Sequence, residues 1–422
     1  NKIRVISAVV SAIMLASSAS AFAKFDAYND SDGFTLGHYE AEVNQEQRAD
    51  TEKLYEQRPK NERQFENLSR GLVAVPGENG TLVSWRFLGT DSNSLTYNLY
   101  CSGEKLNDKP ITTTNFFHTG ASTNAEYTLK EVENGEETGV EYTTTAWDKN
   151  YIGFKVTERE GYNIDDGAVA DLDGDGEYEI LLRRVPSMDV NTRTSYPVIE
   201  AYKTDGTHMW TIDIGPNEIN EVDINFLAYD MDGDGKAEVI MRSFEGTTDG
   251  KGNTTGDTNG DGITDYSKSE SNLAIFKDRQ YIVSTPEFLS IYDGETGEET
   301  DRTDLKPSKE PLSDWSYRYS DTGRLTKRAS HYLFGLAYLD GVTPSVVMVR
   351  GAWDNVRAAA WHIEDGKFKE DWVHNTENKD DVNSIWGACN HNLVTVDVDF
   401  DGKDEILSGP MAIDHDGSEM YA

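Results

Sequence analysis

Three segments of the chain place carboxylates at the spacing that a hard cation requires. They begin at Asp171, Asp230 and Asp397, and each carries acids at positions 1, 3, 5 and 9 and a glycine at position 6. Ca²⁺ binds six to eight oxygen ligands, and a short loop of this kind can fold its side chains around one ion. The predicted calcium ligands are Asp171, Asp173, Asp175 and Glu179 in the first loop, Asp230, Asp232, Asp234 and Glu238 in the second, and Asp397, Asp399, Asp401 and Glu405 in the third.

A fourth segment has similar donor spacing, and its predicted ligands are Asp257, Asn259, Asp261 and Asp265. The alternative for this segment is a simple glycine-rich turn. For every loop two roles stay open: a bound ion can hold the turn between two strands, which is the commoner role, or it can contact a substrate.

The residues that follow the first three loops predict strands. Ile180-Leu-Leu182, Val239-Ile-Met241 and Ile406-Leu407 are short, apolar and rich in residues that favour strands. An EF-hand would instead have helical flanks and its last acid at position 12. Recurrence of a loop followed by a strand predicts a repeated β architecture.

The length and net charge indicate how many domains the chain has and which binding partners suit it. A chain of 422 residues is too long for one ordinary core and indicates two or three domains. The net charge of −37 makes duplex nucleic acid an unsuitable partner, because binding that polyanion requires clustered Lys and Arg. An acidic polysaccharide would also be repelled unless bound cations or local arginines reversed the field at the binding cleft.

The N-terminal residues predict export. Lys2 and Arg4 precede an apolar run from Val5 to Leu15, and Ala21-Phe-Ala23 has the pattern of a signal-peptidase site. We therefore expect a signal peptide at 1–23 and a monomer that is secreted or periplasmic, with no membrane span.

Cys101 and Cys389 can form a bridge in such a compartment, but two buried free thiols are the favoured alternative.

Composition shifts divide the rest of the chain into three parts. Residues 24–62 are polar and predict a leader, and 63–155 contain short alternating strands that predict a fibronectin-III-like β-sandwich with Trp85 in its core. Residues 156–422 contain the acidic loops and predict a calcium-binding β-propeller. Four or five blades fit into this length, so we expect either a ring truncated at the C-terminus or a ring that closes with unusually few blades.

Several ordered motifs resemble rhamnogalacturonan lyases of polysaccharide lyase family 11. The resemblance runs from about Asn67 to the last residue. It implies a sandwich followed by an eight-bladed propeller with many calcium ions, and β-elimination in the rhamnose–galacturonate backbone of pectin. The motifs are Asn67-Leu-Ser-Arg-Gly-Leu-Val-Ala-Val75, Val83-Ser-Trp-Arg-Phe-Leu-Gly-Thr-Asp91, the loops at 171 and 230, Leu336-Ala-Tyr-Leu-Asp-Gly341, Asn390-His-Asn-Leu393 and Ser408-Gly-Pro-Met-Ala412.

The chain departs from the family pattern at the expected cleft. Asp165 stands where the family has Asn, and 183–188 and 220–226 replace stretches that contact substrate in the family. Arg183 replaces a family Lys, and neighbours on a strand point to opposite sides, so at most one of Arg183 and Arg184 should face substrate. We predict catalytic roles for Arg183 and His391, and substrate binding by Asp165, Arg184, Asn390 and Asn392. The alternatives are a surface ion pair for Arg183 and a structural role at the third loop for His391.

Three functions follow from these observations. The favoured hypothesis is an exported, calcium-dependent lyase for rhamnogalacturonan. The second is a non-catalytic calcium-stiffened propeller that binds glycan, which the altered cleft keeps open. The third is a lyase for another acidic polysaccharide, such as a sulfated uronan, which the arginine pair would suit.

Overall fold

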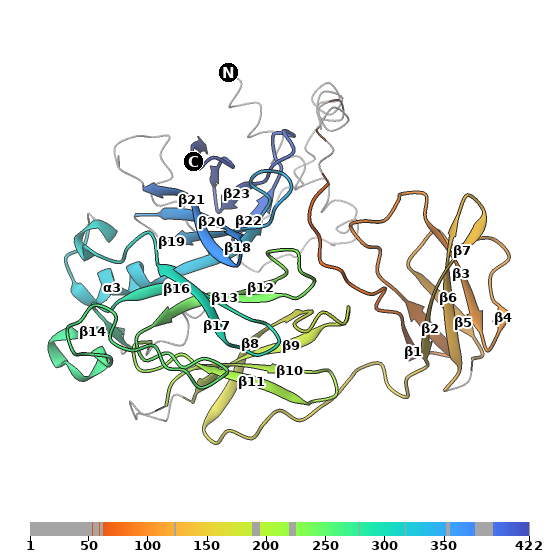
Figure 1. Ribbon diagram of the computed structural model, residues 1–422, viewed down its shortest axis with the longest axis horizontal. Coiled ribbons are helices and arrows are strands. Elements are labelled where there is room, and N and C mark those ends of the chain that lie inside the picture. Colours follow the sequence, from red (N-terminus) through yellow and green to blue (C-terminus); the bar gives the residue numbers. More distant parts are fainter. Residues whose placement is uncertain are drawn as a thin grey trace, which may run out of the picture.

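The computed structural model describes residues 62–421 except 122–123, 188–194, 219–224, 278, 317, 352–354 and 376–390, together with the single residues 53 and 59. The predicted signal peptide, nearly all of the polar leader, Cys389 and Asn390 lie outside the described residues. The described chain consists mostly of antiparallel strands, which confirms the predicted all-β fold class. Figure 1 shows an N-terminal part in orange and a larger part running from yellow to blue.

The N-terminal part is a sandwich of two sheets around one core. The sheets have the strand orders β1-β2-β5 and β4-β3-β6-β7. Trp85 follows β2, is 6% exposed and packs its ring 5.2 Å from that of Tyr97, so it is a core residue as predicted. The strands are β1 (Val73–Gly77), β2 (Gly80–Ser84), β3 (Thr96–Cys101), β4 (Glu104–Lys105), β5 (Asn115–Thr119), β6 (Glu126–Glu133) and β7 (Glu136–Thr145).

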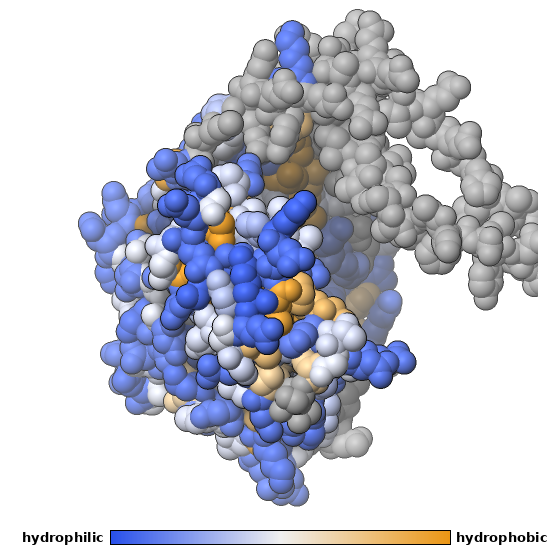
Figure 2. Space-filling model, turned by 90° about the vertical axis from the view of Figure 1, so that its right-hand side faces the viewer, coloured by the Kyte–Doolittle hydropathy of each residue, from blue (hydrophilic) through white to orange (hydrophobic). Residues whose placement is uncertain are grey.

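The surface at the sandwich end is largely hydrophilic, with a small hydrophobic patch (Figure 2). Cys101, at the end of β3, is a half-buried free thiol.

None of the helices in the described part of the chain combines the length and the apolar composition that crossing a membrane requires.

The larger part contains four four-stranded antiparallel sheets, which we number I to IV in chain order. In each sheet the spatial order of the strands is their order along the chain, so each strand pairs with the one before it and the one after it in that sheet. Sheet I contains β8 (Tyr162–Ala170), β9 (Glu179–Pro186), β10 (Val198–Tyr202) and β11 (His208–Asp213); sheet II contains β12 (Phe226–Tyr229), β13 (Glu238–Phe244), β16 (Glu287–Tyr292) and β17 (Glu299–Asp304); sheet III contains β18 (Tyr332–Ala337), β19 (Ser345–Arg350), β20 (Arg357–Glu364) and β21 (Lys367–Asn375); and sheet IV contains β22 (Val394–Val396), β23 (Glu405–Ser408), β24 (Met411–Ile413) and β25 (Glu419–Tyr421).

The four sheets pack face to face in series. Their first strands, β8, β12, β18 and β22, contact one another in chain order. Alternate side chains of an inner strand enter different cores: Val239 and Met241 of β13 pack toward sheet I, whereas Ile240 packs toward sheet III. Because both faces of these strands are buried, their sequences are continuous apolar runs without polar alternation. The sheets form an arc that the described residues do not close.

Two insertions between strands of this arc form additional structure outside the four sheets. The first, between β13 and β16, carries the fourth acidic segment, the short helices η2 (Tyr266–Lys268) and η3 (Glu270–Asn272), and the hairpin of β14 (Leu273–Phe276) and β15 (Arg279–Ile282). The second, between β17 and β18, carries η4 (Leu312–Trp315) and the only α-helix longer than two turns in the described chain, α3 (Thr322–Ser330). The Asp321 side chain caps α3 by accepting from the Arg324 amide at 2.9 Å.

A buried charge cluster joins sheets II and III to the second insertion. Arg350 is fully buried, its Nη2 lies 2.6 Å from Glu287 Oε2, and its Nε donates to the carbonyl of Ala329 in α3. Arg242 Nη1 lies 3.4 Å from the other oxygen of Glu287. Burial would raise the pKa of Glu287, but Arg350, Lys309 and Arg242 outweigh burial and lower it. Burial also lowers the pKa of Lys309 to about 8.

We expect Glu287→Gln to lower the free energy of unfolding by about 3–5 kcal/mol, because the change leaves buried arginines without their carboxylate. Urea unfolding followed by tryptophan fluorescence measures this loss. The control is Glu364→Gln, whose side chain is 65% exposed and lies 3.8 Å from Lys369; its loss should stay below about 1 kcal/mol. Equal losses in the two variants would contradict the cluster's structural role.

Candidate functional site

Three acidic loops join the first and second strands of sheets I, II and IV. In the first loop, Asp171 accepts from the amides of Gly174 and Gly176 at 2.9 and 2.8 Å. Asp230 accepts from Gly233 and Gly235 at 2.7 and 3.0 Å in the same way. These hydrogen bonds fold each loop inward and bring the remaining carboxylates together, as the predicted spacing required.

The third loop achieves the same turn with one unusual residue. Phe400 stands at position 4, where the first two loops have glycine, and has a φ of +66°, in the left-handed region that glycine adopts without strain. The Gly402 amide still donates to Asp397 at 3.1 Å. The loop geometry is therefore kept despite the substitution.

Unpartnered buried oxygens indicate what the loops hold. In each loop the acid at position 9 accepts one backbone amide, as Glu405 does from Val398 at 2.7 Å. Its other oxygen, Oε1, is buried and has no hydrogen-bond partner in the described residues, and the same is true of one oxygen each of Asp173 and Asp397. A buried carboxylate oxygen without a partner is costly. Bound cations would remove this cost.

Carboxylate atoms of each loop gather within one ion's reach. Ligand atoms of Asp171, Asp173 and Asp175 lie within 4.8 Å of one another, as do those of Asp230, Asp232 and Asp234, and those of Asp397, Asp399 and Glu405. Burial, together with neighbouring aspartates, raises the pKa of Glu238 and of Glu405 to about 8. An all-oxygen, strongly acidic donor set of this kind fits Ca²⁺.

Sheet III lacks such a loop. The corresponding turn contains only Asp340, which accepts from the amides of Val342 and Thr343 at 2.7 Å each. Asp404, at the end of the third acidic loop, instead accepts from the Tyr338 amide of this turn at 3.0 Å. The turn of sheet III is therefore held by hydrogen bonds to its neighbours.

His415 is a candidate ligand that the sequence analysis missed. Its ring lies with Asp401 and Glu405 in a fourth group of donors within 4.8 Å, and its Nδ1 is 3.5 Å from Asp401. It sits in the turn between the third and fourth strands of sheet IV. In sheet I the equivalent turn carries Lys203, which forms an ion pair with Asp173. Aligning these two turns would have identified His415.

Residues 62–69, before the first sandwich strand, run along the acidic loops, and we call this segment the strap. Arg63 pairs with Asp404 at 2.8 Å, Gln64 Nε2 donates to the carbonyl of Asp230 at 3.2 Å, and the Ser69 amide donates to the carbonyl of Gly176 at 2.8 Å. Burial, followed by repulsion from Asp230 and Asp171, raises the pKa of Glu66 to about 7. The strap therefore crosses all three loops.

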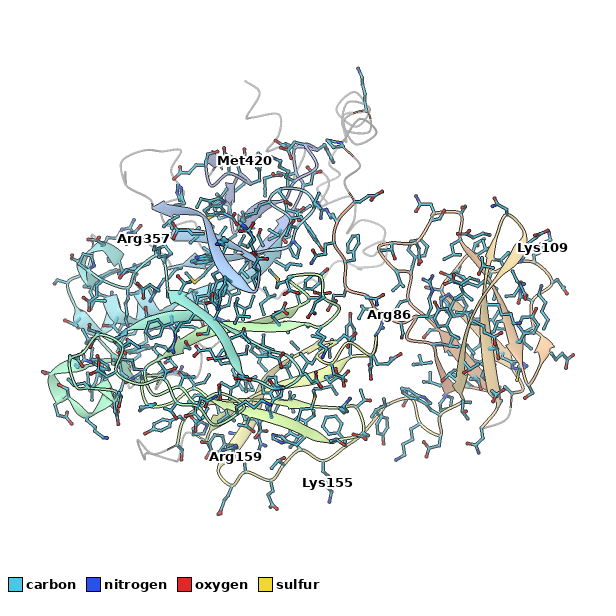
Figure 3. All side chains as sticks on the ribbon, in the orientation of Figure 1. Arg86, Lys109, Lys155, Arg159, Arg357 and Met420 are labelled. Carbon is cyan, nitrogen blue, oxygen red and sulfur yellow. The ribbon has the colours of Figure 1, made fainter. Side chains whose placement is uncertain are left out.

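The sandwich adds a further contact at the same place. Arg86 lies on the side of the sandwich that faces the arc (Figure 3) and stacks over the ring of Tyr178 at 4.4 Å. Tyr178 belongs to the first acidic loop.

The predicted substrate residues of sheet I lie at the other end of its strands. Asp165 forms an ion pair with Arg183, and Asp166 lies 3.8 Å from the same guanidinium. Arg184 points to the opposite face, where it pairs with the fully buried Glu200 at 3.0 Å and donates to the carbonyl of Thr157. The alternation prediction is therefore correct. Arg184 is 4% exposed, and its contacts favour a structural role.

His391 lies near the start of sheet IV, at the same end of the strands. It is exposed, and its ring centroid is 5.4 Å from that of His331, which precedes β18. Asn392 is also exposed, and its carbonyl accepts from Ser408 Oγ at 2.7 Å. The alternative role of His391, a structural one at the third acidic loop, stays a prediction. His331 was missed because its neighbour comes from a distant part of the sequence.

The predicted substrate residues Asp165 and His391 are far from the acidic loops. Asp165 precedes the first loop by six residues, and His391 precedes the third loop by six. Along an extended strand this separates them by about 20 Å, at about 3.3 Å per residue. Cations in these three loops would therefore hold turns and would not touch a substrate at Arg183 or His391.

The fourth segment differs in one predicted ligand. Asp257, Asn259 and Asp261 form an exposed turn like the other loops, but Asp265 accepts from Ser267 and pairs with Lys268 at 3.0 Å. Both oxygens of Asp265 are therefore engaged within the chain, and these contacts favour a structural role over the predicted role as a ligand.

We expect calcium to stabilise the protein more at pH 8 than at pH 5. Without a cation, Glu238 and Glu405 have folded pKa values raised to about 8. Their contribution to stability is complete below their unfolded pKa near 4.5 and is lost as the pH rises toward 8. Calcium replaces the protons and removes this loss. Melting temperatures in EGTA and in calcium at both pH values measure the effect, and a calcium shift of equal size at both would contradict it.

Two family models match the chain in order. The model described as rhamnogalacturonan I lyases beta-sheet domain matches residues 63–147, and the model described as rhamnogalacturonan lyase family 11, C-terminal domain, matches residues 153–422. Among curated proteins, the rhamnogalacturonan endolyase YesW of Bacillus subtilis (strain 168) is 38% identical over 375 residues, which are 85% of this chain and 57% of YesW. The exolyase YesX of the same strain is 37% identical over 377 residues, 85% of this chain and 58% of YesX.

Solved structures agree with these matches. The crystal structure of YesW has a TM-score of 0.72 and 37% identity, and covers 86% of this chain and 61% of that one. The Bacillus licheniformis rhamnogalacturonan lyase PL11 has a TM-score of 0.71 and 36% identity over the same shares. The chain spans about three fifths of the length of these relatives. On these matches, the chain belongs to rhamnogalacturonan lyase family 11.

Proposed function

We propose that the protein containing this chain is an exported, calcium-dependent lyase that cleaves rhamnogalacturonan by β-elimination at galacturonate. One observation carries the proposal: two lyase-family models match in order over residues 63–147 and 153–422. We also propose that the four-sheet arc is part of a calcium-binding β-propeller, and that the sandwich is fibronectin-III-like. The signal-like pattern at 1–23 supports export.

The reaction requires a base and a positive group at one place. Removal of the C5 proton of galacturonate leaves negative charge on the adjacent carboxylate, and fixed positive groups stabilise that charge. A histidine side chain can accept the proton near neutral pH. His391 is exposed beside His331, and both lie at the end of the arc that carries Arg183. His391 is therefore our candidate base.

Calcium supports this function by holding the strands that carry these residues. A cation in the substrate cleft would supply charge stabilisation for the carboxylate. At about 3.3 Å per strand residue, Arg183 lies about 13 Å from Glu179 and His391 about 20 Å from Asp397, so ions in these loops would act on structure. Arg183 is held in position by Asp165 and Asp166, and a substrate carboxylate would compete with these acids for its guanidinium.

A second candidate function is calcium-stabilised glycan binding without catalysis. Both arginines of the altered cleft segment are engaged by intrachain acids, Arg183 by Asp165 and Arg184 by Glu200. Such engagement leaves less positive charge for a reaction intermediate. The relatives named as an endolyase and an exolyase are 38% and 37% identical to the chain, so the similarity favours neither mode.

We expect the protein, expressed over the full length of its gene, to release unsaturated uronate from rhamnogalacturonan I, and EGTA to abolish this release. His391→Ala should lower the rate by about 100-fold or more, because loss of a positioned base has that effect. The near-ultraviolet absorbance of the unsaturated product measures both. His208→Ala, at an exposed position on β11, is the control and should keep full rate.

Polygalacturonate and a sulfated uronan serve as parallel substrates in the same assay. Cleavage of the sulfated polymer alone would favour the third hypothesis. Binding to these polymers without product from any of them would favour the non-catalytic alternative and would reject the proposed lyase.

A further inference from the structure

We infer that the first insertion holds a fourth divalent-cation site, and that Glu245 closes it. The site would take a hard, oxygen-binding cation such as Ca²⁺, held by Asp257, Asn259, Asp261 and Glu245. This inference does not depend on the proposed lyase activity.

The turn at 257–263 repeats the geometry of the other acidic loops. Asp257 accepts from the amides of Gly260 and Gly262 at 2.7 and 2.8 Å, as Asp171 does from Gly174 and Gly176. The carboxylate at position 5, Asp261, accepts from the amide two residues later at 2.8 Å. Its position in the turn is therefore that of Asp175 in the first loop.

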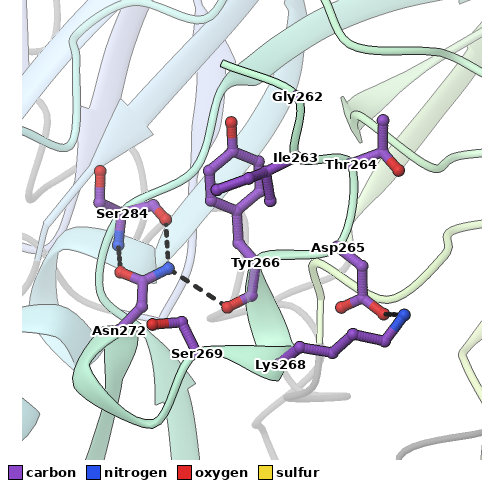
Figure 4. A pocket seen from close by; sticks show the side chains of 9 residues that line it. All are labelled: Gly262, Ile263, Thr264, Asp265, Tyr266, Lys268, Ser269, Asn272 and Ser284. Carbon is purple, nitrogen blue, oxygen red and sulfur yellow. Dashed lines mark hydrogen bonds and ion pairs between the residues drawn. The ribbon is translucent and has the colours of Figure 1, made fainter.

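Glu245 takes the place that the position-9 glutamate has in the other loops. In the first loop the amide of Leu172, at position 2, donates to Glu179 at 2.8 Å. In the fourth turn position 2 is Thr258, and its amide donates to Glu245 Oε1 at 2.6 Å. Glu245 follows the end of β13, so the closing carboxylate comes from before the turn. Asp265 is directed toward Lys268 at the edge of the neighbouring pocket (Figure 4).

The second oxygen of Glu245 indicates a bound ligand. Glu245 is fully buried, and its Oε2 has no hydrogen-bond partner within the described part of the chain. No Lys, Arg or His of the described residues forms an ion pair with it. A buried carboxylate without a counter-charge is strongly destabilising. Glu405 Oε1 in the third loop is likewise buried without a hydrogen-bond partner, so a bound cation would stabilise both carboxylates in the same way.

The site would fix the insertion to the arc. Asn217 Nδ2 donates to the carbonyls of Glu245 and Thr264 at 2.7 and 3.0 Å, and Asn217 Oδ1 accepts from the Tyr266 amide at 2.8 Å. The Tyr266 hydroxyl donates to Asp261 at 2.8 Å. Residues from the same turn line a cavity of about 670 Å³ that also includes Lys268 and Asn272 (Figure 4). A cation at Glu245 would therefore order one wall of this cavity.

Calcium content after exhaustive dialysis tests the inference. Glu245→Gln, which keeps the shape of the side chain, should bind one ion fewer per chain than the wild type. Asp261→Asn, at an exposed position, should lose the same ion without disturbing the core. Asp265→Asn is the matched control and should keep the full number, and near-ultraviolet circular dichroism checks that each variant is folded.

Terbium luminescence gives an independent readout. Excitation of Tyr266, whose hydroxyl contacts Asp261, should sensitise a Tb³⁺ ion in this site, so Glu245→Gln and Asp261→Asn should both remove that part of the emission. The inference is overturned if folded Asp261→Asn and Glu245→Gln keep every ion, or if Asp265→Asn alone loses one. Both readouts measure binding, so either result is independent of lyase activity.

Discussion

Buried carboxylates without a counter-charge are the constraint on which this part of the molecule depends. Of the acids at position 9, Glu179 and Glu405 are buried, and each begins the second strand of its sheet. Glu405 accepts a backbone amide with one oxygen, and its other oxygen has no hydrogen-bond partner among the described residues. A cation bound in each loop would supply a partner for these carboxylates. A net charge of −37 is tolerable because much of it is concentrated where cations would neutralise it.

This constraint divides the arc into two ends with different tasks. At one end the acidic loops, the strap and Arg86 fasten turns and join the sandwich to the sheets. At the other end lie two pairs of residues: Asp165 with Arg183 in sheet I, and His331 with His391 at the starts of sheets III and IV. Residues 166–170 of β8 and β22 (Val394–Val396) lie between the acidic loops and this second end. The buried cluster around Glu287 and Arg350 joins sheets II and III at this second end, away from the acidic loops.

Local patterns in the sequence predicted local structure well. The predicted strand residues Ile180–Leu182, Val239–Met241 and Ile406–Leu407 lie in β9, β13 and β23, and the acids of the first three loops converge as their spacing indicated. The failures are non-local. Spacing selected Asp265 for the fourth turn because it lies at position 9, whereas Glu245 approaches from the other side. His331, His415 and the strap were missed because their partners lie tens to hundreds of residues away, and no local periodicity reports such contacts.

The strap has a consequence for the order in which the chain can assemble. Arg63 and Asp404 are separated by 341 residues, so their ion pair cannot form until nearly the whole described chain has been synthesised. Closing so long a loop carries a large entropic cost, which earlier-formed sheets must offset. The N-terminal segment would thus be among the first parts made and the last to dock. Docking of the strap onto the assembled sheets would thus be the last step of folding. In a nascent chain that lacks sheet IV, Arg63 of the strap would have no Asp404 to pair with.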